Sequence, residues 1–195
     1  NVPLAAPSAT PSGYVSPTTA AHVASGLQGK IPYILNGGTC SVGLESTIIG
    51  WNKAGETEIY RLGGVATEAI EEILGHPVHS IKKITENPDA PGQLKSHYAT
   101  HKPLYIGDPL KFAPSFPKTE IILIRYKDFH PDFQAGQQLL LAPSGTKEEA
   151  ACNLFRILRE ADQLKAAIII AERLPDDGIG KAVNDRLERA QHLMK

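Results

Sequence analysis

Apolar residues at helical spacing dominate the C-terminal part of the chain. Residues 146–149 form a capping sequence, and apolar positions then recur every three or four residues through about residue 164. Residues 180–193 repeat this spacing, which predicts a second amphipathic helix. On this second helix we expect an inward face of Val183, Leu187 and Ala190 and an outward face of Lys181, Asp185, Arg186 and Arg189.

Short apolar runs bounded by Pro, Gly and polar residues predict strands. They lie at residues 104–106, 121–124, 138–141 and 166–170 in the second half of the chain, and at residues 2–6, 33–35, 46–51 and 58–61 in the first. The first half also predicts two short helices. One covers residues 18–27 after the cap Ser16, and the other covers residues 68–74 between Thr67 and Gly75. Because strands alternate with helices, we assign the chain to the α/β class.

Proline and glycine concentrate at residues 86–103, where the apolar periodicity is lost. We interpret this stretch as an extended linker. It separates residues 1–85 from residues 104–195, and each part has its own predicted strands and helices. The sequence therefore predicts two α/β domains, of which the second is a small open sandwich.

Composition and charge argue against several classes of protein. The 195 residues include 20 Lys+Arg and 21 Asp+Glu, a balance that gives no global sign of a nucleic-acid or anionic-membrane surface. The apolar runs fall far short of the roughly 18 residues of a membrane span, so no membrane partner is expected. The two cysteines, Cys40 and Cys152, are far apart, which favours a reducing, cytoplasmic location without a disulfide framework or a zinc site.

Two hydroxyl-rich loops are candidates for ligand binding. Residues 7–13 follow a predicted strand and precede a helix start, where backbone N–H groups and the helix end suit a phosphate or carboxylate. Residues 37–47 form a Gly- and hydroxyl-rich loop in which Ser41, Ser46 or Thr47 could donate hydrogen bonds to a small ligand. Residues 7–13 could equally be an ordinary Ser/Pro/Gly turn, and residues 37–47 a long hairpin connection. For each loop, the ligand-binding and the purely structural interpretation therefore stay open.

Single charged and aromatic residues offer further candidates. Arg61 ends a predicted strand and could clamp phosphate or carboxylate, or be an ordinary surface arginine. Glu45 could be a catalytic carboxylate, although a solvated loop acid is the more frequent case. His97 and Tyr98 could stack on a base or anchor the linker to a core. The sequence shows no cluster with metal-ligand spacing.

The order of these motifs resembles the YrdC-like threonylcarbamoyl-AMP synthase family. The resemblance rests on residues 4–13, 16–18, 37–47 and 61–64. Pro91-Gly92, His97-Tyr98-Ala99 and the run at residues 178–187 resemble the long, two-domain branch of that family. The resemblance implies a YrdC-like twisted-sheet α/β domain in residues 1–85, a linker that acts as a lid, and a Rossmann-like three-layer α/β accessory domain.

The resemblance also implies an activity and its ligands. L-Threonine, bicarbonate and ATP would yield threonylcarbamoyl-adenylate and pyrophosphate, and a downstream transferase would use the product to modify adenosine in tRNA. Mg²⁺ would accompany ATP, held mainly by phosphate oxygens. No residue is implied as a covalent nucleophile. By matching positions, ATP would be bound by Ser8, Thr10, Ser16, Arg61 and Tyr98, with Ser16 at a helix N-terminus, and L-threonine by the backbone of Ala6 and by Ser46.

Three features depart from the family pattern. One lies in the linker, where Leu94, Lys95 and Ser96 occupy the stretch in which the family commonly shows Lys, Tyr and Arg, so part of the positive charge of the lid is moved or missing. Thr10 stands where the family usually has Asn, and the Lys-x-Arg motif of the family's N-terminal portion has no counterpart before Asn1. We therefore expect this chain to hold the second half of the synthase domain, the linker and the accessory domain, and to be inactive without the first half. The alternatives are a non-catalytic RNA-binding module and a nucleotide-sensing module of the same fold.

Overall fold

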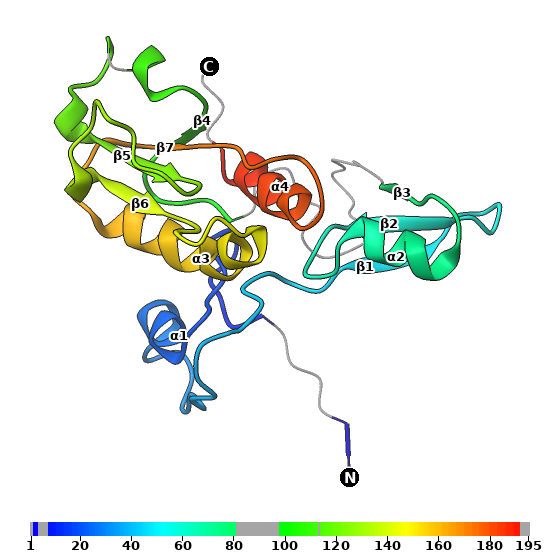
Figure 1. Cartoon of the computed structure of the whole chain (residues 1–195). Coiled ribbons are helices and arrows are strands. Elements are labelled where there is room, and N and C mark those ends of the chain that lie inside the picture. The colour runs from blue at the N-terminus through cyan, green and yellow to red at the C-terminus, as the bar shows by residue number, and fades with distance from the viewer. Residues whose placement is uncertain (1, 4–7, 81–97, 113, 192–195) are drawn as a thin grey trace.

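The computed structural model describes residues 2–3, 8–80, 98–112 and 114–191, and the strands of these residues form two sheets (Figure 1). The sheet of the C-terminal part is parallel throughout, which confirms the α/β class expected from the sequence. Its strand order is β4-β7-β5-β6. These strands are β4 (Leu104–Ile106), β5 (Ile121–Arg125), β6 (Gln138–Leu140) and β7 (Ile168–Ala171).

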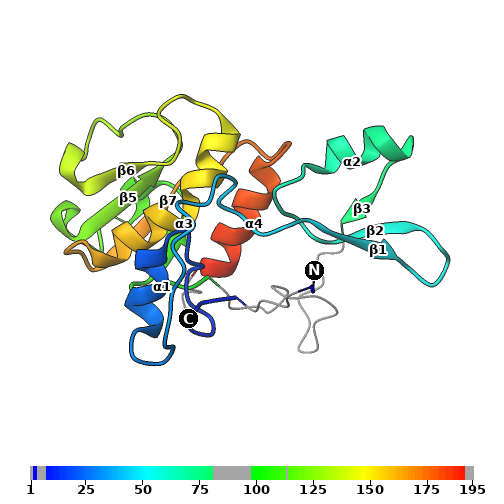
Figure 2. The same cartoon turned by 90° about the horizontal axis from the view of Figure 1, so that it is seen from below.

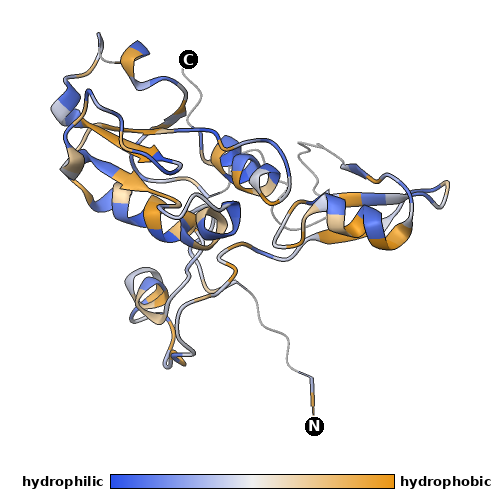
Figure 3. Ribbon diagram, in the orientation of Figure 1, coloured by the Kyte–Doolittle hydropathy of each residue, from blue (hydrophilic) through white to orange (hydrophobic). Residues whose placement is uncertain are grey.

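The two faces of this sheet are covered in different ways. Two helices, α3 (Lys147–Gln163) and α4 (Gly180–Ala190), lie side by side over one face and share a core with Ile122, Ile124 and Ile169 (Figures 1 and 2). Alternate strand residues point to the opposite face, where they pack against aromatic side chains from the connecting segments. Because both faces are covered, the strands are apolar at nearly every position, as the colour of β5 shows (Figure 3).

Three short 3₁₀ helices lie in the connections of this part of the chain. Their bounds are η1 (Pro109–Lys111), η2 (Lys118–Glu120) and η3 (Ala135–Gln137). The longer helix α3 begins where the sequence predicts, because the side chain of Thr146 accepts a hydrogen bond from the Glu149 N–H at 3.3 Å. No helix in the described residues is long and apolar enough to cross a bilayer.

The N-terminal part contains a small mixed sheet of order β1-β2-β3. Strands β1 and β2 are antiparallel and β3 runs parallel to β2. Helix α2 ends at Gly75, whose φ of 73° is the left-handed conformation that glycine favours at a helix end. The elements of this part are α1 (Ala20–Leu27), β1 (Ile48–Trp51), β2 (Thr57–Arg61), α2 (Thr67–Leu74) and β3 (His79–Ser80).

Three sequence predictions in this part are wrong. Thr67 is the first residue of α2 rather than its cap, since the cap position is Ala66, which makes no side-chain capping bond. Residues 33–35 form no strand, and Tyr33 and Leu35 are 87% and 95% exposed, because no partner strand lies alongside them in the described residues. The first helix starts at Ala20 rather than after Ser16, since Thr19 is its cap and accepts from the His22 N–H at 3.2 Å. Ser16 is therefore not at a helix N-terminus. The strand predicted at residues 2–6 falls mostly on residues 4–7, outside the described part.

Two stretches of the N-terminal part lie directly on α3. Val15 is fully buried in the core shared by α3 and α4, and the strand-like bridge between Tyr14 and Ala99 joins this stretch to the last part of the predicted linker. Gly43 has a φ of +74°, and a Cβ atom there would overlap the backbone of Cys152. Residues 14–16 and 43–45 are thus fixed against the C-terminal part, and this contact positions the site described next.

Candidate functional site

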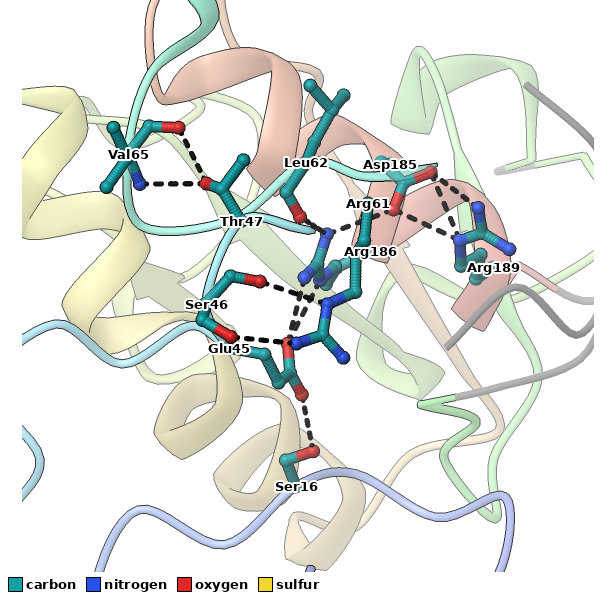
Figure 4. Close-up of polar contacts among 10 residues, drawn as sticks. All are labelled: Ser16, Glu45, Ser46, Thr47, Arg61, Leu62, Val65, Asp185, Arg186 and Arg189. Carbon is teal, nitrogen blue, oxygen red and sulfur yellow. Dashed lines mark hydrogen bonds and ion pairs between the residues drawn. The ribbon is translucent and has the colours of Figure 1, made fainter. Parts of the chain in front are cut away.

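The centre of the candidate site is an ion pair between Glu45 and Arg186 (Figure 4). The Arg186 Nε and Nη2 atoms donate to Glu45 Oε2 at 3.2 and 3.0 Å. Its Nη1 atom donates to the backbone oxygen of Leu62 at 2.6 Å and to Asp185 Oδ2 at 3.1 Å. The Arg186 side chain is 0% exposed, so this cation is buried against its partners rather than solvated.

The sequence pattern of α4 placed Arg186 on the outward face, and that prediction is wrong. The outer side of this turn of α4 meets the loop that carries Glu45 and the end of β2, so the guanidinium is covered by the N-terminal part. Sequence reasoning therefore missed Arg186 as a site residue. The one signal was an acidic residue, Glu45, within a Gly-rich loop, which needs a cation if it is buried.

Glu45 connects this arginine to two residues expected at the nucleotide. Ser16 Oγ donates to Glu45 Oε1 at 2.9 Å. Tyr98 is 1% exposed, lies with its ring 5.5 Å from Arg186 Cζ and stacks on Phe155. Burial raises the pKa of Tyr98 to about 12, to which the charge of Glu45 and a hydrogen bond with it also contribute. Burial also acts to raise the pKa of Glu45, but the Arg186 charge and the hydrogen bonds that the carboxylate accepts together outweigh burial and hold that pKa below its ordinary value.

Arg61 and Ser46 form the second half of the site. The Arg61 Nε atom donates to the Ser46 backbone oxygen at 3.0 Å, and Nη2 donates to Ser46 Oγ at 3.2 Å (Figure 4). Burial lowers the pKa of Arg61, while the charge of Glu45 acts in the opposite direction. Next to Ser46, Thr47 Oγ1 donates to the Val65 oxygen at 2.7 Å and accepts from the Val65 N–H at 3.1 Å.

Gly63 explains why the loop before β1 and the end of β2 lie so close together. A Cβ atom at Gly63 would overlap the Thr47 nitrogen and the Glu45 oxygen. The next amide, Gly64 N–H, donates to the Glu45 oxygen at 3.0 Å. Only glycine allows this approach of two backbones, and the approach sets Ser46 beside Arg61.

A cavity of about 370 Å³ opens beside Arg61, between α2, β2 and α4. Its size is within the range of small-molecule pockets. Positive and negative side chains both line it, so it offers partners to a ligand that carries both charges. The polar lining includes Arg61, Thr67, Glu71, Lys181, Asp185 and Arg189.

The structure brings together four of the seven residues that the resemblance implicated. Ser16, Ser46, Arg61 and Tyr98 surround the Glu45–Arg186 pair. Thr10 lies nearby, with Oγ1 donating to the Val15 oxygen at 3.4 Å. Ser8 is exposed, and Ala6 lies outside the described residues. Their binding roles remain predictions.

A second polar cluster fixes the chain on either side of the site. The buried Asp162 carboxylate at the end of α3 accepts from Tyr14 Oη at 3.0 Å and from the Lys102 N–H at 2.9 Å, and lies 2.6 Å from His101 Nδ1. Burial acts to raise the pKa of Asp162, but the hydrogen bonds to its carboxylate together have the larger effect. The pKa of Asp162 is therefore lower than its ordinary value. The stretch before Ser16 and the stretch after Tyr98 are thereby tied to one carboxylate.

Comparison with known proteins places this arrangement in a family. A model described as the C-terminal domain of threonylcarbamoyl-AMP synthase matches residues 65–191, more than half of the chain, and one described as telomere recombination matches residues 1–63. The threonylcarbamoyl-AMP synthase of Bacillus subtilis is 34% identical over 97% of this chain, and that of Pyrococcus abyssi is 33% identical over 96%. The Schizosaccharomyces pombe enzyme is 32% identical over 98%.

A solved structure agrees with these sequence relatives. The crystal structure of P. abyssi Sua5 complexed with L-threonine superposes with a TM-score of 0.78 and 31% identity, over 94% of this chain and 56% of that one. The chain spans 57% of the length of the B. subtilis and P. abyssi relatives. These comparisons confirm the resemblance read from the motifs: the chain belongs to the threonylcarbamoyl-AMP synthase family.

Proposed function

We propose that this chain forms part of an enzyme that converts L-threonine, bicarbonate and ATP into threonylcarbamoyl-adenylate and pyrophosphate. The observation that carries the proposal is the convergence of Ser16, Ser46, Arg61 and Tyr98, from four separate stretches of sequence, on the Glu45–Arg186 pair. The P. abyssi relative, whose structure contains L-threonine, supports the amino-acid substrate.

The proposed chemistry has two steps. The amine of threonine adds to bicarbonate with loss of water to give a carbamate. The carbamate oxygen then attacks the α-phosphorus of ATP, and the bond to pyrophosphate breaks. Neither step needs a covalent enzyme intermediate, so the protein contributes by aligning the reactants and stabilising the negative charge of the phosphates.

Each site residue suits one part of this task. We assign Arg61 to the nucleotide because its planar guanidinium matches phosphate geometry. We assign Ser46, which Arg61 holds in place, to threonine. Tyr98 would cover the nucleotide from the linker side, for which its side chain, 1% exposed here, would have to leave its contact with Phe155. The hydroxyl groups of Ser8, Thr10 and Ser16 would bind phosphate oxygens, and the Ala6 backbone would contact threonine.

Magnesium would enter as part of the ATP complex. In the described part of the chain, the two carboxylates that contact the Arg186 guanidinium are already engaged, Glu45 by Arg186 and Ser16, and Asp185 by Arg186 and Arg189. An ion at this site would therefore be held mainly by phosphate oxygens and water, which is the usual mode for Mg²⁺ with nucleotides. Its chemistry would be to neutralise charge on the departing pyrophosphate.

The product is an activated carbamoyl group, so a transferase that passes it to tRNA adenosine is the proposed downstream partner. We further propose a cytoplasmic location, which the two free cysteines support because reduced thiols are typical of that compartment.

Pyrophosphate release from ATP tests the proposal. The measurement uses the chain alone and an extended protein, in which the chain carries at its N-terminus the corresponding segment of the B. subtilis relative. The expected result is release by the extended protein that requires both L-threonine and bicarbonate. ATP binding without threonine-dependent release would instead support a nucleotide sensor, and salt-dependent tRNA binding alone would support an RNA-binding module.

A further inference from the structure

Arg186 belongs to α4 of the C-terminal part, but its guanidinium ends among groups of the N-terminal part. It donates two hydrogen bonds to Glu45 and one to the Leu62 oxygen, and it lies over the ring of Tyr98. Figure 4 shows it reaching from α4 into the space between the loop before β1 and the end of β2. One buried side chain thus contacts three stretches that are distant in sequence.

Apart from Asp185 on its own helix, the groups described above as contacts of Arg186 are proposed ligand residues or adjoin one. Glu45 precedes Ser46 and holds the hydroxyl of Ser16. Leu62 follows Arg61. Tyr98 is the residue assigned to cover the nucleotide. A movement of the guanidinium would therefore displace the nucleotide residues together.

We propose that Arg186 is a positioning residue, through which the Rossmann-like part of the chain sets the geometry of the nucleotide site. The inference rests on the proposed function, because it concerns the same ATP site. The planar fork is needed for this task, since it bonds a carboxylate and a backbone oxygen in fixed directions at once. A lysine keeps the positive charge but provides a single nitrogen at that place.

A second arginine of the C-terminal part, Arg159, binds the stretch that contains Ser16. Arg159 of α3 donates through Nε to the Ser16 oxygen at 3.3 Å and through Nη2 to the Val15 oxygen. Its guanidinium also lies over the Tyr14 ring, 4.8 Å from the centroid. Ser16 is therefore fixed from two helices, through its backbone by Arg159 and through its hydroxyl by the Glu45–Arg186 pair.

A purely structural role for Arg186 makes a different prediction from a positioning role. Replacing a buried ion pair by two apolar residues of similar size often preserves stability or increases it. The double variant R186M/E45M should therefore fold, while it loses the hydrogen bonds to Leu62 and Ser16. If the pair serves stability alone, this variant should also keep its affinity for ATP.

The test measures the KM for ATP and the melting temperature of the extended protein and of its variants R186K, R186M/E45M and R156M. Arg156 serves as the control because it also pairs with a glutamate, Glu160 at 3.1 Å, but on the exposed side of α3. We expect the KM for ATP to rise about 10- to 100-fold in R186K and R186M/E45M and to stay unchanged in R156M. The double variant should melt within a few degrees of the parent.

The outcomes separate this inference from the proposed function. If R186M/E45M folds and its KM for ATP equals that of the parent, the positioning role is overturned while the proposed function stands. If the parent extended protein shows no threonine-dependent pyrophosphate release, the proposed function is overturned and the inference with it. If the KM for ATP rises in R186K and also in the well-folded double variant, the result supports both the positioning role and the proposed function.

Discussion

Glu45 and Arg186 are 141 positions apart in sequence, and yet the Glu45 carboxylate accepts two hydrogen bonds from the Arg186 guanidinium. The pair joins the loop before β1 to α4, so the two parts of the chain share one buried polar contact at the candidate site. Burying a charged pair is costly unless its hydrogen bonds are satisfied. Here Ser16, Leu62 and Asp185 complete the bonding of the pair.

The Gly63→Ala substitution should damage the site although it leaves the side chain of every proposed ligand residue unchanged. The added methyl group would overlap backbone atoms of Glu45 and Thr47, so the loop that carries Ser46 must move away from Arg61. We expect a loss of about 1–3 kcal/mol in the free energy of unfolding, typical of overpacking. Pyrophosphate release by the extended protein should also fall.

Gly37→Ala is the matched control for this change. Gly37 lies in the same Gly-rich stretch, but a Cβ atom there would meet nothing within 4 Å. Urea unfolding should show little change for this variant. Equal destabilisation by both substitutions would contradict the close approach at Gly63.

Two arginines on α3 should respond differently to substitution by methionine. Arg159→Met removes the side-chain donor to the Ser16 oxygen and leaves the Val15 oxygen with the long 3.4 Å bond from Thr10 Oγ1, which should cost about 1–3 kcal/mol of unfolding free energy. Arg156→Met removes an exposed ion pair with Glu160 and should cost at most about 1 kcal/mol. Chemical denaturation of both variants checks the difference, and a smaller effect at Arg159 than at Arg156 would contradict the tie to Ser16.

The Asp162→Asn substitution should show a pH-dependent loss of stability. The native pKa of Asp162 is lowered from 3.8 by hydrogen bonds that outweigh its burial, so its ionised form stabilises the fold above that pH. This contribution is lost as the pH falls through the lowered native pKa. We therefore expect the free energy of unfolding of the wild type to be about 1–3 kcal/mol greater than that of Asp162→Asn near neutral pH.

Below pH 3.8 the difference between the two proteins should shrink, because the wild-type carboxyl group becomes protonated while asparagine does not titrate. Unfolding free energies measured across the acid range check this window. A difference that stays constant as the pH falls would show that the charge of Asp162 contributes nothing.

Local signals in the sequence were sufficient for the C-terminal part. The cap Thr146 and the apolar spacing after it predict α3 at its observed start, and the run at residues 121–124 predicts β5. These predictions succeed because a helix cap and the apolar run of a strand that is buried on both faces are both recognisable from a few consecutive residues. The run at residues 33–35 has the same apolar character but no strand beside it in the described residues, so its pattern predicted a strand wrongly.

The candidate site depends on contacts that no local pattern shows. Ser16, Ser46, Arg61 and Tyr98 were expected from the family resemblance, while their residue types alone left ordinary turns and surface positions open. Arg186 was missed because the helical pattern assigns a charged residue to the solvent side. Its burial depends on Glu45, which lies in a loop of the other part of the chain.

Hydrogen exchange of the extended protein, with and without ATP and L-threonine, tests most directly whether the site lies where these residues meet. The account predicts slower exchange at the amides of residues 14–16, 45–47 and 61–64 when both substrates are bound, with little change on the far side of the C-terminal sheet. Substrate binding that leaves all three stretches unprotected would contradict the placement of the site.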